Sequence, residues 1–354
     1  MKKTAIIFSP IYYRHDPGRG HPESRRRLRA IISELKNGAL SRNESWQFVT
    51  PKKASTEDVE LVHAPEYVKL VDAVCKAGGG FLDLEDTMVS QESYETALYA
   101  VGGTLKAVDL VLKGSYENGF ALVRPPGHHA SKFRACGFCL FNNVSIAAEY
   151  LLRKRKLKRI LILDVDAHHG NGTQETFYDT DKVLYISLHE DPCGFPGTGF
   201  IDEIGEGEGL GHTVNIPLPF GTSDQIYLQA MEELVAPIIR QYEPQFMLVS
   251  AGFDGHYTDP VGSLALSALC YRKVYDMIVN LASEICEKRL VTVLEGGYNV
   301  KWIGELAAIA LAKMSSMPFT IRDKVPTLDI NVKVQGEKIV KEAKKAQKAF
   351  WKLD

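Results

Sequence analysis

The sequence predicts an α/β fold in which helices cover both faces of one mostly parallel sheet. Short apolar segments alternate along the chain with longer segments whose apolar residues recur at helical spacing, as in parallel strands joined by crossover helices. Residues 160–163 (ILIL) are apolar throughout, which is expected of a strand buried on both faces. We find no repeat, low-complexity segment or interdomain linker, so residues 1–354 are expected to form one domain.

Eight short segments are predicted to be strands because they are apolar and rich in β-branched or aromatic residues. In chain order they are residues 4–8, 48–50, 120–123, 160–163, 183–189, 213–218, 246–250 and 290–294. Amphipathic spacing predicts helices at residues 24–35, 67–76, 93–113, 145–152, 223–242, 267–287 and 302–313, with a capped helix start near 56. The charged tail is expected to form a C-terminal amphipathic helix at about 333–352 that packs on the domain through Ile339, Ala343, Ala346 and Phe350.

Two connecting segments are also informative. The three glycines at 78–80 are expected to end the preceding helix, and the acidic residues 82–87 to form a loop. Residues 190–211 are rich in glycine and form an unusually long connection. Connections of this length in a compact domain usually carry function.

Composition excludes several classes of protein. Of the 354 residues, 45% are hydrophobic and 24% are charged, and the net charge of −2 gives no electrostatic reason to expect binding to nucleic acid or to an anionic membrane. The basic clusters at 25–27 and 153–156 are expected to be solvated surface. No apolar run reaches transmembrane length, and residues 1–8 are expected to begin a strand rather than a signal peptide. Six cysteines in so long a chain do not indicate a disulfide framework, so we expect a cytoplasmic protein.

The segment that follows residues 160–163 has the residue types of a metal site. Side chains alternate along a strand, so Asp164, Asp166 and His168 share one face if the extended geometry continues. Three such groups at the end of a buried strand require compensation, and a divalent metal provides it. The alternative is that Asp164 or Asp166 caps the next helix while the histidines pack locally. Cys136 and Cys139 also have metal-ligand spacing, but the sequence contains no second such pair.

Polar groups end four of the predicted strands, and the carboxyl ends of parallel strands meet at one edge of a sheet. These groups are His128 and His129, the segment at 164–168, Asp254 and Tyr298. Asp166, His168 and Asp254 form the best ligand set, which suits Zn²⁺ with an open position, although Fe²⁺ or Co²⁺ also fits.

The other strand-end groups suit catalysis beside such a metal. His128 or His129 can act as general base, and Tyr298 can donate a hydrogen bond to a developing oxyanion. The alternatives are a polar turn that satisfies one histidine through backbone groups, and a tyrosine that only packs.

These motifs resemble the signature blocks of the histone deacetylase superfamily. The blocks are RPPGHHA at 124–130, DVDAHHGNGT at 164–173, AGFD at 251–254 followed by Asp259-Pro260, and EGGY at 295–298. Together with HPE at 21–23, they are most similar to the class II and bacterial deacetylase-like branch, which includes acetylpolyamine amidohydrolases. The resemblance covers nearly the whole chain in the correct order. It implies the arginase/deacetylase fold, a single α/β domain around an eight-stranded sheet.

The resemblance also implies the catalytic roles of the strand-end residues. One Zn²⁺ per chain is implied on Asp166, His168 and Asp254. His129 is implied as general base and acid, with His128 as its electrostatic partner held by Asp164. Tyr298 is implied to polarise the acetyl carbonyl.

Further residues are implied to contact the substrate or structural cations. Phe138 and Phe195 match the walls of an acyl-lysine tunnel, and the Gly137 carbonyl matches one that faces the substrate amide. Arg27 matches an arginine that lines an acetate exit, although Arg25 is close enough to leave that alignment open. A structural K⁺ is implied near Asp164, Ser187 and Leu188 with backbone oxygens of Asp166 and His168, and a second monovalent site near Phe177, Thr180 and Val183.

Three positions bear on the branch and the substrate. Asn171 replaces the aspartate that class I enzymes place beside the second histidine. Because an amide stabilises imidazolium less than a carboxylate does, we predict that His129 is less basic than His128. Val261 is neutral where a polyamine-selective relative carries an acid, but Asp86 could replace that acid as a cation reader.

The sequence therefore predicts a zinc-dependent deacetylase that acts on acetyl-lysine in proteins or on small acetylated amines. Tyr298, rather than the histidine of weakly active relatives, predicts a competent enzyme. Rival interpretations are an acetylpolyamine or other small-amide amidohydrolase, a binuclear manganese ureohydrolase of the same fold, and a non-catalytic reader of acetyl-lysine. The acyl preference, the native metal and the oligomeric state stay open, and a homo-oligomer is compatible with the sequence.

Overall fold

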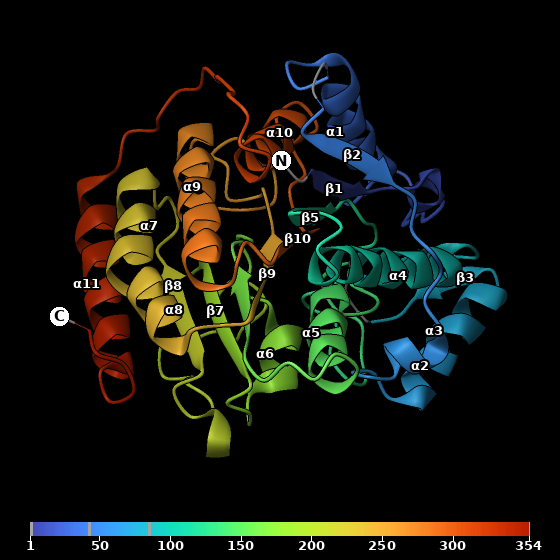
Figure 1. Ribbon diagram of the computed structural model, residues 1–354, viewed down its shortest axis with the longest axis horizontal. Coiled ribbons are helices and arrows are strands. Elements are labelled where there is room, and N and C mark those ends of the chain that lie inside the picture. The colour runs from blue at the N-terminus through green and yellow to red at the C-terminus, as the bar shows by residue number, and fades with distance from the viewer. Residues whose placement is uncertain (1–2, 42–43, 84–85, 354) are drawn as a thin grey trace.

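A computed structural model describes residues 3–41, 44–83 and 86–353 (Figure 1). Its centre is an eight-stranded sheet in the order β2-β1-β5-β10-β9-β6-β7-β8, and every pair is parallel. The strands are β1 (Thr4–Ile7), β2 (Trp46–Val49), β5 (Asn118–Ala121), β6 (Ile160–Asp164), β7 (Val183–Glu190), β8 (Thr213–Leu218), β9 (Phe246–Ala251) and β10 (Leu290–Leu294). The predicted α/β class is therefore confirmed, and the large sheet is wholly rather than mostly parallel.

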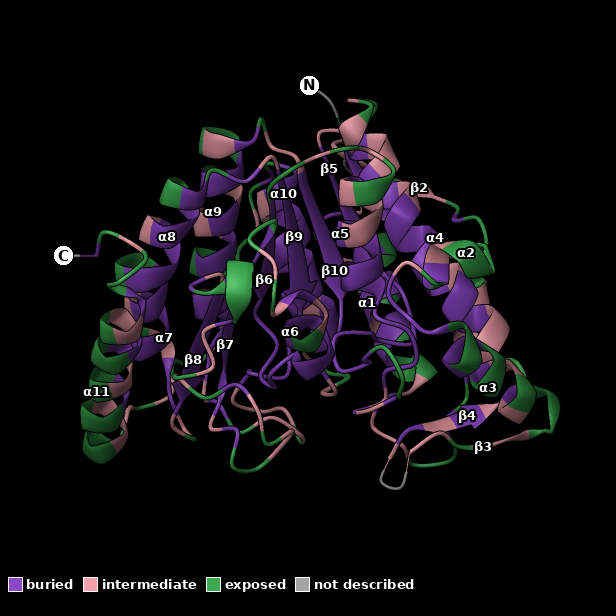
Figure 2. Cartoon of the chain, turned by 90° about the horizontal axis from the view of Figure 1, so that it is seen from below, coloured by how far each residue is buried: buried purple, intermediate pink, exposed green. Residues whose placement is uncertain are grey.

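The helices form layers around this sheet. They are α1 (Arg25–Asn37), α2 (Thr56–Val59), α3 (Pro65–Lys76), α4 (Ser93–Leu112), α5 (Asn143–Arg153), α6 (Asn171–Phe177), α7 (Asp224–Ala230), α8 (Ala236–Tyr242), α9 (Ala268–Ile285), α10 (Ile303–Met314) and α11 (Ile330–Gln347). Short 3₁₀ turns, η1 (Pro10–Tyr13) and η2 (Gly207–Gly209), and a π-helical turn, η3 (Met231–Val235), complete the chain. Helices α1, α10 and α9 pack on one another, whereas α4 and α5 pack together against β5 and β6. Figure 2 shows buried strands inside and exposed helix surfaces outside.

The central strands explain why the ionisable residues meet. All residues of β6 are buried, and β6 lies between β7 and β9. Asp164, the last residue of β6, pairs in register with Ser187 of β7 and Ser250 of β9. Because all three strands run in the same direction, the loops after them emerge together at one edge of the sheet.

A pair of short strands and helix α6 differ from the sequence-based expectation. β3 (Gly79–Phe81) and β4 (Met88–Ser90) form a separate antiparallel pair that was not predicted. Helix α3 does end before the three glycines, and the described residues of 82–87 lie between the two strands, as expected of a loop. Gly79 has φ +104°, and a side chain there would overlap the backbone of Val89, so this glycine also permits close strand pairing. Residues 84 and 85 of the expected loop lie outside the described residues. Helix α6 was not predicted, because its sequence, NGTQETF, has no apolar periodicity.

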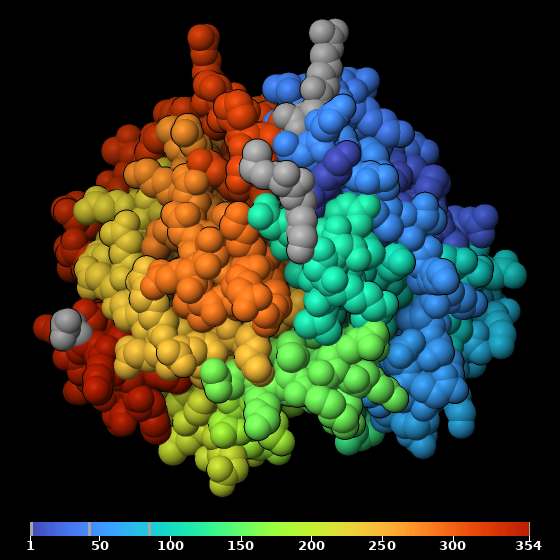
Figure 3. Space-filling view, in the orientation of Figure 1, coloured from blue at the N-terminus to red at the C-terminus, as the bar shows by residue number. Residues whose placement is uncertain are grey.

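The C-terminal helix exists, but its bounds and its buried side differ from the prediction. It covers Ile330–Gln347 rather than 333–352, and it contacts β8 and α7. Its buried residues are Gly336, Val340, Ala343 and Gln347, so only Ala343 of the predicted set is buried. A Cβ atom at Gly336 would lie 2.7 Å from the side chain of Ile226, so this glycine permits close packing of α11 on α7. The space-filling view shows this C-terminal segment in red beside α7 and α8 (Figure 3). In the described part of the chain, no helix combines the length and hydropathy needed to span a bilayer.

Candidate active site

Three predicted ligands converge at the carboxyl edge of the sheet. Asp166 and His168 lie in the loop after β6, and Asp254 follows β9. All three are buried, and one potential ligand atom from each lies within 4.8 Å of the others. The Nδ1 atom of His168 is 3.4 Å from Asp166 Oδ1 and 3.1 Å from Asp254 Oδ2. Asp166 and His168, which the alternating pattern at 164–168 placed on one face, therefore lie together with Asp254 in the structure.

Backbone amides hold the two carboxylates in place. Ala167 donates its N–H to Asp254 Oδ1 at 2.9 Å, and Gly296 donates to Asp166 Oδ2 at 2.8 Å. A Cβ atom at Gly296 would overlap both carboxylates. The glycine after Glu295 is therefore required by the close approach of the two carboxylates.

The donor set fits a divalent cation. Burial, followed by the charge of Asp166, raises the pKa of Asp254 to about 7. Within the described residues, the ion pairs of Asp166 and Asp254 are formed with histidines and not with Lys or Arg. Two buried carboxylates and one imidazole form a ligand set typical of zinc.

The two histidines after β5 have different partners. His128 Nδ1 lies 3.1 Å from Asp164 Oδ2, which also accepts a hydrogen bond from Tyr185 Oη at 3.2 Å. His129 Nδ1 lies 2.8 Å from the side-chain oxygen of Asn171. Both histidines are buried, and their ring centroids are 3.9 Å apart.

Their different surroundings give His128 and His129 different pKa values. Burial opposes protonation of His128, but the carboxylates of Asp166 and Asp164 outweigh it and raise its pKa to about 10. Burial and the charge on His128 lower the pKa of His129 well below its ordinary value. The predicted order of basicity therefore agrees with the structure. The low pKa of His129 is caused by burial and the neighbouring charge, whereas its hydrogen bond with Asn171 raises that pKa without outweighing them.

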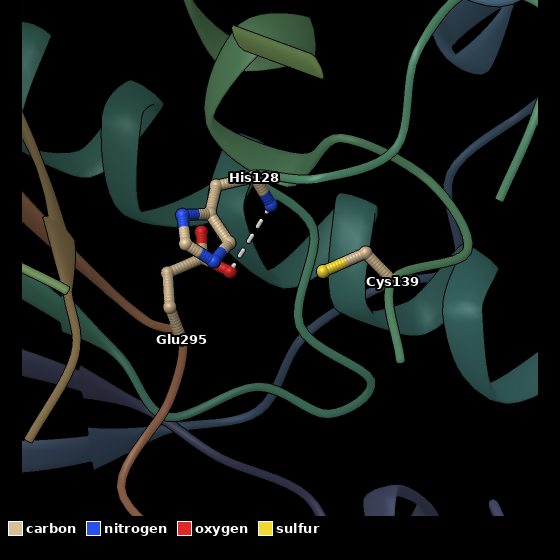
Figure 4. Close-up of side chains that lie close together, drawn as sticks. All are labelled: His128, Cys139 and Glu295. Atoms are coloured by element: carbon tan, nitrogen blue, oxygen red, sulfur yellow. Dashed lines mark hydrogen bonds between the residues drawn. The ribbon is translucent and has the colours of Figure 1, made fainter. Parts of the chain in front are cut away.

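Glu295 is a site residue that sequence reasoning missed. It is fully buried, and its Oε2 atom accepts N–H bonds from Gly127 at 2.7 Å and His128 at 3.3 Å (Figure 4). Glu295 thus connects the segment after β10 to the segment that carries the histidines. Burial raises its pKa to about 7. The signal was present, because an acidic residue directly after a buried strand needs partners.

Cys139 lies beside His128 and Glu295 (Figure 4) and forms a second group of potential ligands with them. Burial raises the pKa of the Cys139 thiol well above its ordinary value, so the thiolate needed for zinc binding is disfavoured. Cys136 and Cys139 exchange backbone hydrogen bonds across a tight turn. Their spacing therefore reflects a turn, in which Gly137 and Phe138 have φ of 53° and 67°.

A cavity of about 300 Å³ leads from the surface to His129, His168 and Tyr298. It is lined by Asp86, His129, Gly137, Phe138, His168, Glu190, Gly194, Phe195, Phe220, Val261, Ser263 and Tyr298. All five predicted substrate-contact residues are among them. Glu190 and Gly194 belong to the long segment 190–211 that was expected to carry function, whereas Phe220 and Ser263 were not predicted.

Aromatic rings form the walls of this cavity. The Phe195 ring lies 5.0 Å from that of His129, and Phe138 meets Tyr298 edge to face at 5.8 Å. The backbone N–H of Tyr298 donates to Asp259 Oδ2 at 2.7 Å, which fixes the turn after β10. Asp259 is a further positioning residue to which the sequence analysis gave no role.

Arg27 does not line the cavity, but it stabilises the turn after β10 that carries Tyr298. Its side chain is fully buried, donates to the carbonyls of Glu295 and Gly297, and lies 4.9 Å from the centre of the Tyr298 ring. Arg27 therefore differs from the solvated cluster expected at 25–27. Its role at an acetate exit stays a prediction.

The monovalent cation sites also stay predictions. Asp164 and Ser187 are register partners on adjacent strands, and the hydroxyl of Ser187 lies 2.8 Å from His189 Nδ1. At the second predicted site, the N–H of Thr180 donates to the carbonyl of Phe177 at 3.4 Å, in the turn before β7 begins at Val183.

Residues 21–314 match the model of the histone deacetylase domain. The chain belongs to the histone deacetylase family. A probable deacetylase of Archaeoglobus fulgidus is 43% identical over 320 residues, which cover 89% of this chain and 88% of that protein. A histone deacetylase-like amidohydrolase of Pseudomonas aeruginosa is 36% identical over 302 residues, covering 85% and 78%. The crystal structure of the HDA15 HD domain has a TM-score of 0.89 and 32% identity over 99% of this chain and 95% of that one.

Family membership confirms the resemblance found in the sequence blocks. It supports a hydrolase of the deacetylase type. The agreement with the HDA15 domain confirms that the present chain has the arginase/deacetylase fold, with one domain around an eight-stranded sheet.

Proposed function

We propose that the protein is a zinc-dependent deacetylase that hydrolyses N-acetyl amides to an amine and acetate. One observation carries the proposal: a single cavity of about 300 Å³ is lined by His129, Tyr298 and His168, one of the three predicted metal ligands. A base, a hydrogen-bond donor and a ligand set are the groups that amide hydrolysis requires around one carbon atom.

Zinc would be held by carboxylate oxygens of Asp166 and Asp254 and by Nδ1 of His168. When bound there, it would polarise the acetyl carbonyl and make water more acidic. The burial of all three side chains supports this assignment, because the cation would compensate charges that water cannot reach.

The protein groups around the cavity divide the proton transfers. His129 is neutral near pH 7 because its pKa is lowered, so it can take a proton from the attacking water and return it to the leaving amine. His128 stays protonated, since its pKa is about 10, and acts as the electrostatic partner held by Asp164. Burial raises the pKa of Tyr298, which keeps its hydroxyl protonated as a hydrogen-bond donor to the acetyl oxygen.

The remaining cavity residues suit an acetylated aliphatic amine. Phe138 and Phe195 would contact the methylene chain, and the Gly137 carbonyl would accept the N–H of the scissile amide. Asp86 at the cavity wall would accept N–H groups of the substrate, whereas Val261 adds no charge. K⁺ near Asp164, Ser187 and Leu188 would stabilise the strand ends that carry the catalytic residues.

A turnover screen tests the proposal. Acetyl-lysine peptides, acetylated polyamines and small acetamides are assayed for acetate release with the wild-type protein, His129→Ala and Tyr298→Phe. We expect turnover of at least one class and a loss of about 10²-fold or more in each variant with zinc still bound. Turnover that is unchanged in His129→Ala, or no turnover of any class by the zinc-loaded protein, contradicts the proposal.

A further inference from the structure

Four arginines line a second hollow, of about 580 Å³, beside the start of α1. They are Arg19, Arg25, Arg26 and Arg29, and we call this feature the arginine hollow. Among the described residues that line it, Asp16 is the only carboxylate. Arg25 and Arg26 belong to the basic cluster that was expected to be solvated surface, and both are exposed, but the fold gathers them with Arg19 and Arg29 around one concavity.

Two of these arginines have no carboxylate partner among the described residues. Arg25 pairs with Asp16 at 3.0 Å, and Arg29 lies over the ring of Tyr13 at 5.4 Å. No carboxylate pairs with Arg19 or Arg26 in the part of the chain that the structure describes, and both are exposed. The hollow thus has a net excess of cationic side chains that can bind an anionic group.

The arginine hollow adjoins the catalytic cavity. His21 lines the hollow, and its ring packs against Phe138 at 4.6 Å. The Nε2 atom of His21 also lies 3.3 Å from the carbonyl oxygen of Asp86. Because Phe138 and Asp86 both line the catalytic cavity, His21 separates the two features.

We propose that the arginine hollow binds the carboxylate of an Asp or Glu residue that flanks the acetyl-lysine of a protein substrate. The inference rests on the proposed deacetylase function and specifies its substrate as an acidic polypeptide segment. An extended chain advances about 3.3 Å per residue, so a side chain a few positions from the acetyl-lysine can reach past His21. A carboxylate complements guanidinium geometry, whereas the free ammonium of a polyamine would be repelled.

Matched peptides test this subsite. Each carries one acetyl-lysine, and a single Glu is moved one position at a time along both flanks, with Gln at the same position as the neutral partner. The proteins are wild type, Arg19→Gln/Arg26→Gln, and the control Arg272→Gln/Lys273→Gln, which removes the same charge from exposed positions on α9. In wild type, we expect kcat/KM for the best Glu peptide to exceed that of its Gln partner by about threefold to tenfold, mainly through KM.

The preference should shrink as salt rises and should disappear only in Arg19→Gln/Arg26→Gln. Equal kcat/KM for every Glu and Gln pair overturns the proposal. A preference that survives in the arginine variant, or that the control loses equally, also overturns it. Fluorescence anisotropy of the same labelled peptides with zinc-loaded His129→Ala separates this result from the enzymatic claim. Glu-selective binding without turnover by wild type would keep the subsite and contradict the deacetylase function.

Discussion

His128 and His129 are adjacent in the chain, but their partners assign them opposite charge states. The carboxylates near His128 keep it protonated, whereas His129 has an amide partner, is buried and lies beside a cation. A neutral His129 can accept a proton at neutral pH, and a charged His128 cannot. The proposed choice of His129 as general base therefore rests on its environment rather than on its position in the HH motif.

Asn171→Asp should raise the pKa of His129, because a carboxylate stabilises imidazolium more than an amide does. The catalytic base must be neutral, so a higher pKa moves the acidic limb of kcat/KM to higher pH, by about one unit or more. The measurement is the pH profile of the zinc-loaded variant, with Asn171→Ala as the uncharged control. An Asp variant whose acidic limb coincides with that of wild type would contradict this account of His129.

Glu295 should act as a positioning residue for the histidine segment. Glu295→Gln retains an oxygen that can accept the N–H groups of Gly127 and His128, whereas Glu295→Ala leaves both donors buried and unpaired. We expect the Ala variant to lose about 1–3 kcal/mol of unfolding free energy per orphaned donor and to have a lower kcat. Urea denaturation and steady-state kinetics of the two variants check this, and equal behaviour of Ala and Gln would be the contrary result.

At the scale of elements, the turn at Cys136–Cys139 places the wall of the cavity. Gly137 has φ +53°, and a Cβ atom there would overlap the His129 ring and stand 3.0 Å from Phe195. Gly137→Ala should therefore displace the base and one wall together, lowering kcat/KM by about 10- to 100-fold. Gly78→Ala is the control, because Gly78 has φ +109° but no atoms within 4 Å of its Cβ position. A kcat/KM that falls equally in both variants would show that backbone strain at the glycine lowers activity, and not the contact with the His129 ring.

The elements also show which features can be predicted from sequence. Strands such as β6 and β9 are buried on both faces, so their composition alone identifies them. Helix α6 and the β3–β4 pair depend on tertiary contacts, because neither has a clear periodic pattern. The buried side of α11 depends on where Gly336 meets Ile226, which no local pattern specifies.

At the scale of the whole molecule, one parallel sheet brings distant segments to one site. Asp166, His168, Asp254 and Tyr298 could be predicted because strand ends in such a sheet share an edge. Glu190 and Glu295 also lie at strand ends, but that position alone assigned no role to them or to Asp259. Their roles depend on which backbone N–H groups and cavity surfaces their side chains reach, and this requires the three-dimensional arrangement.

One zinc ion held by Asp166, His168 and Asp254 should be needed for acetate release. The most direct measurement is acetate release by chelator-treated protein during titration with zinc, using the best substrate from the screen. We expect negligible turnover without metal and a linear rise that ends at one zinc per chain, with His129→Ala binding the same zinc but losing about 10²-fold or more of its turnover. Turnover that survives metal removal, or that requires two manganese ions per chain, would contradict it.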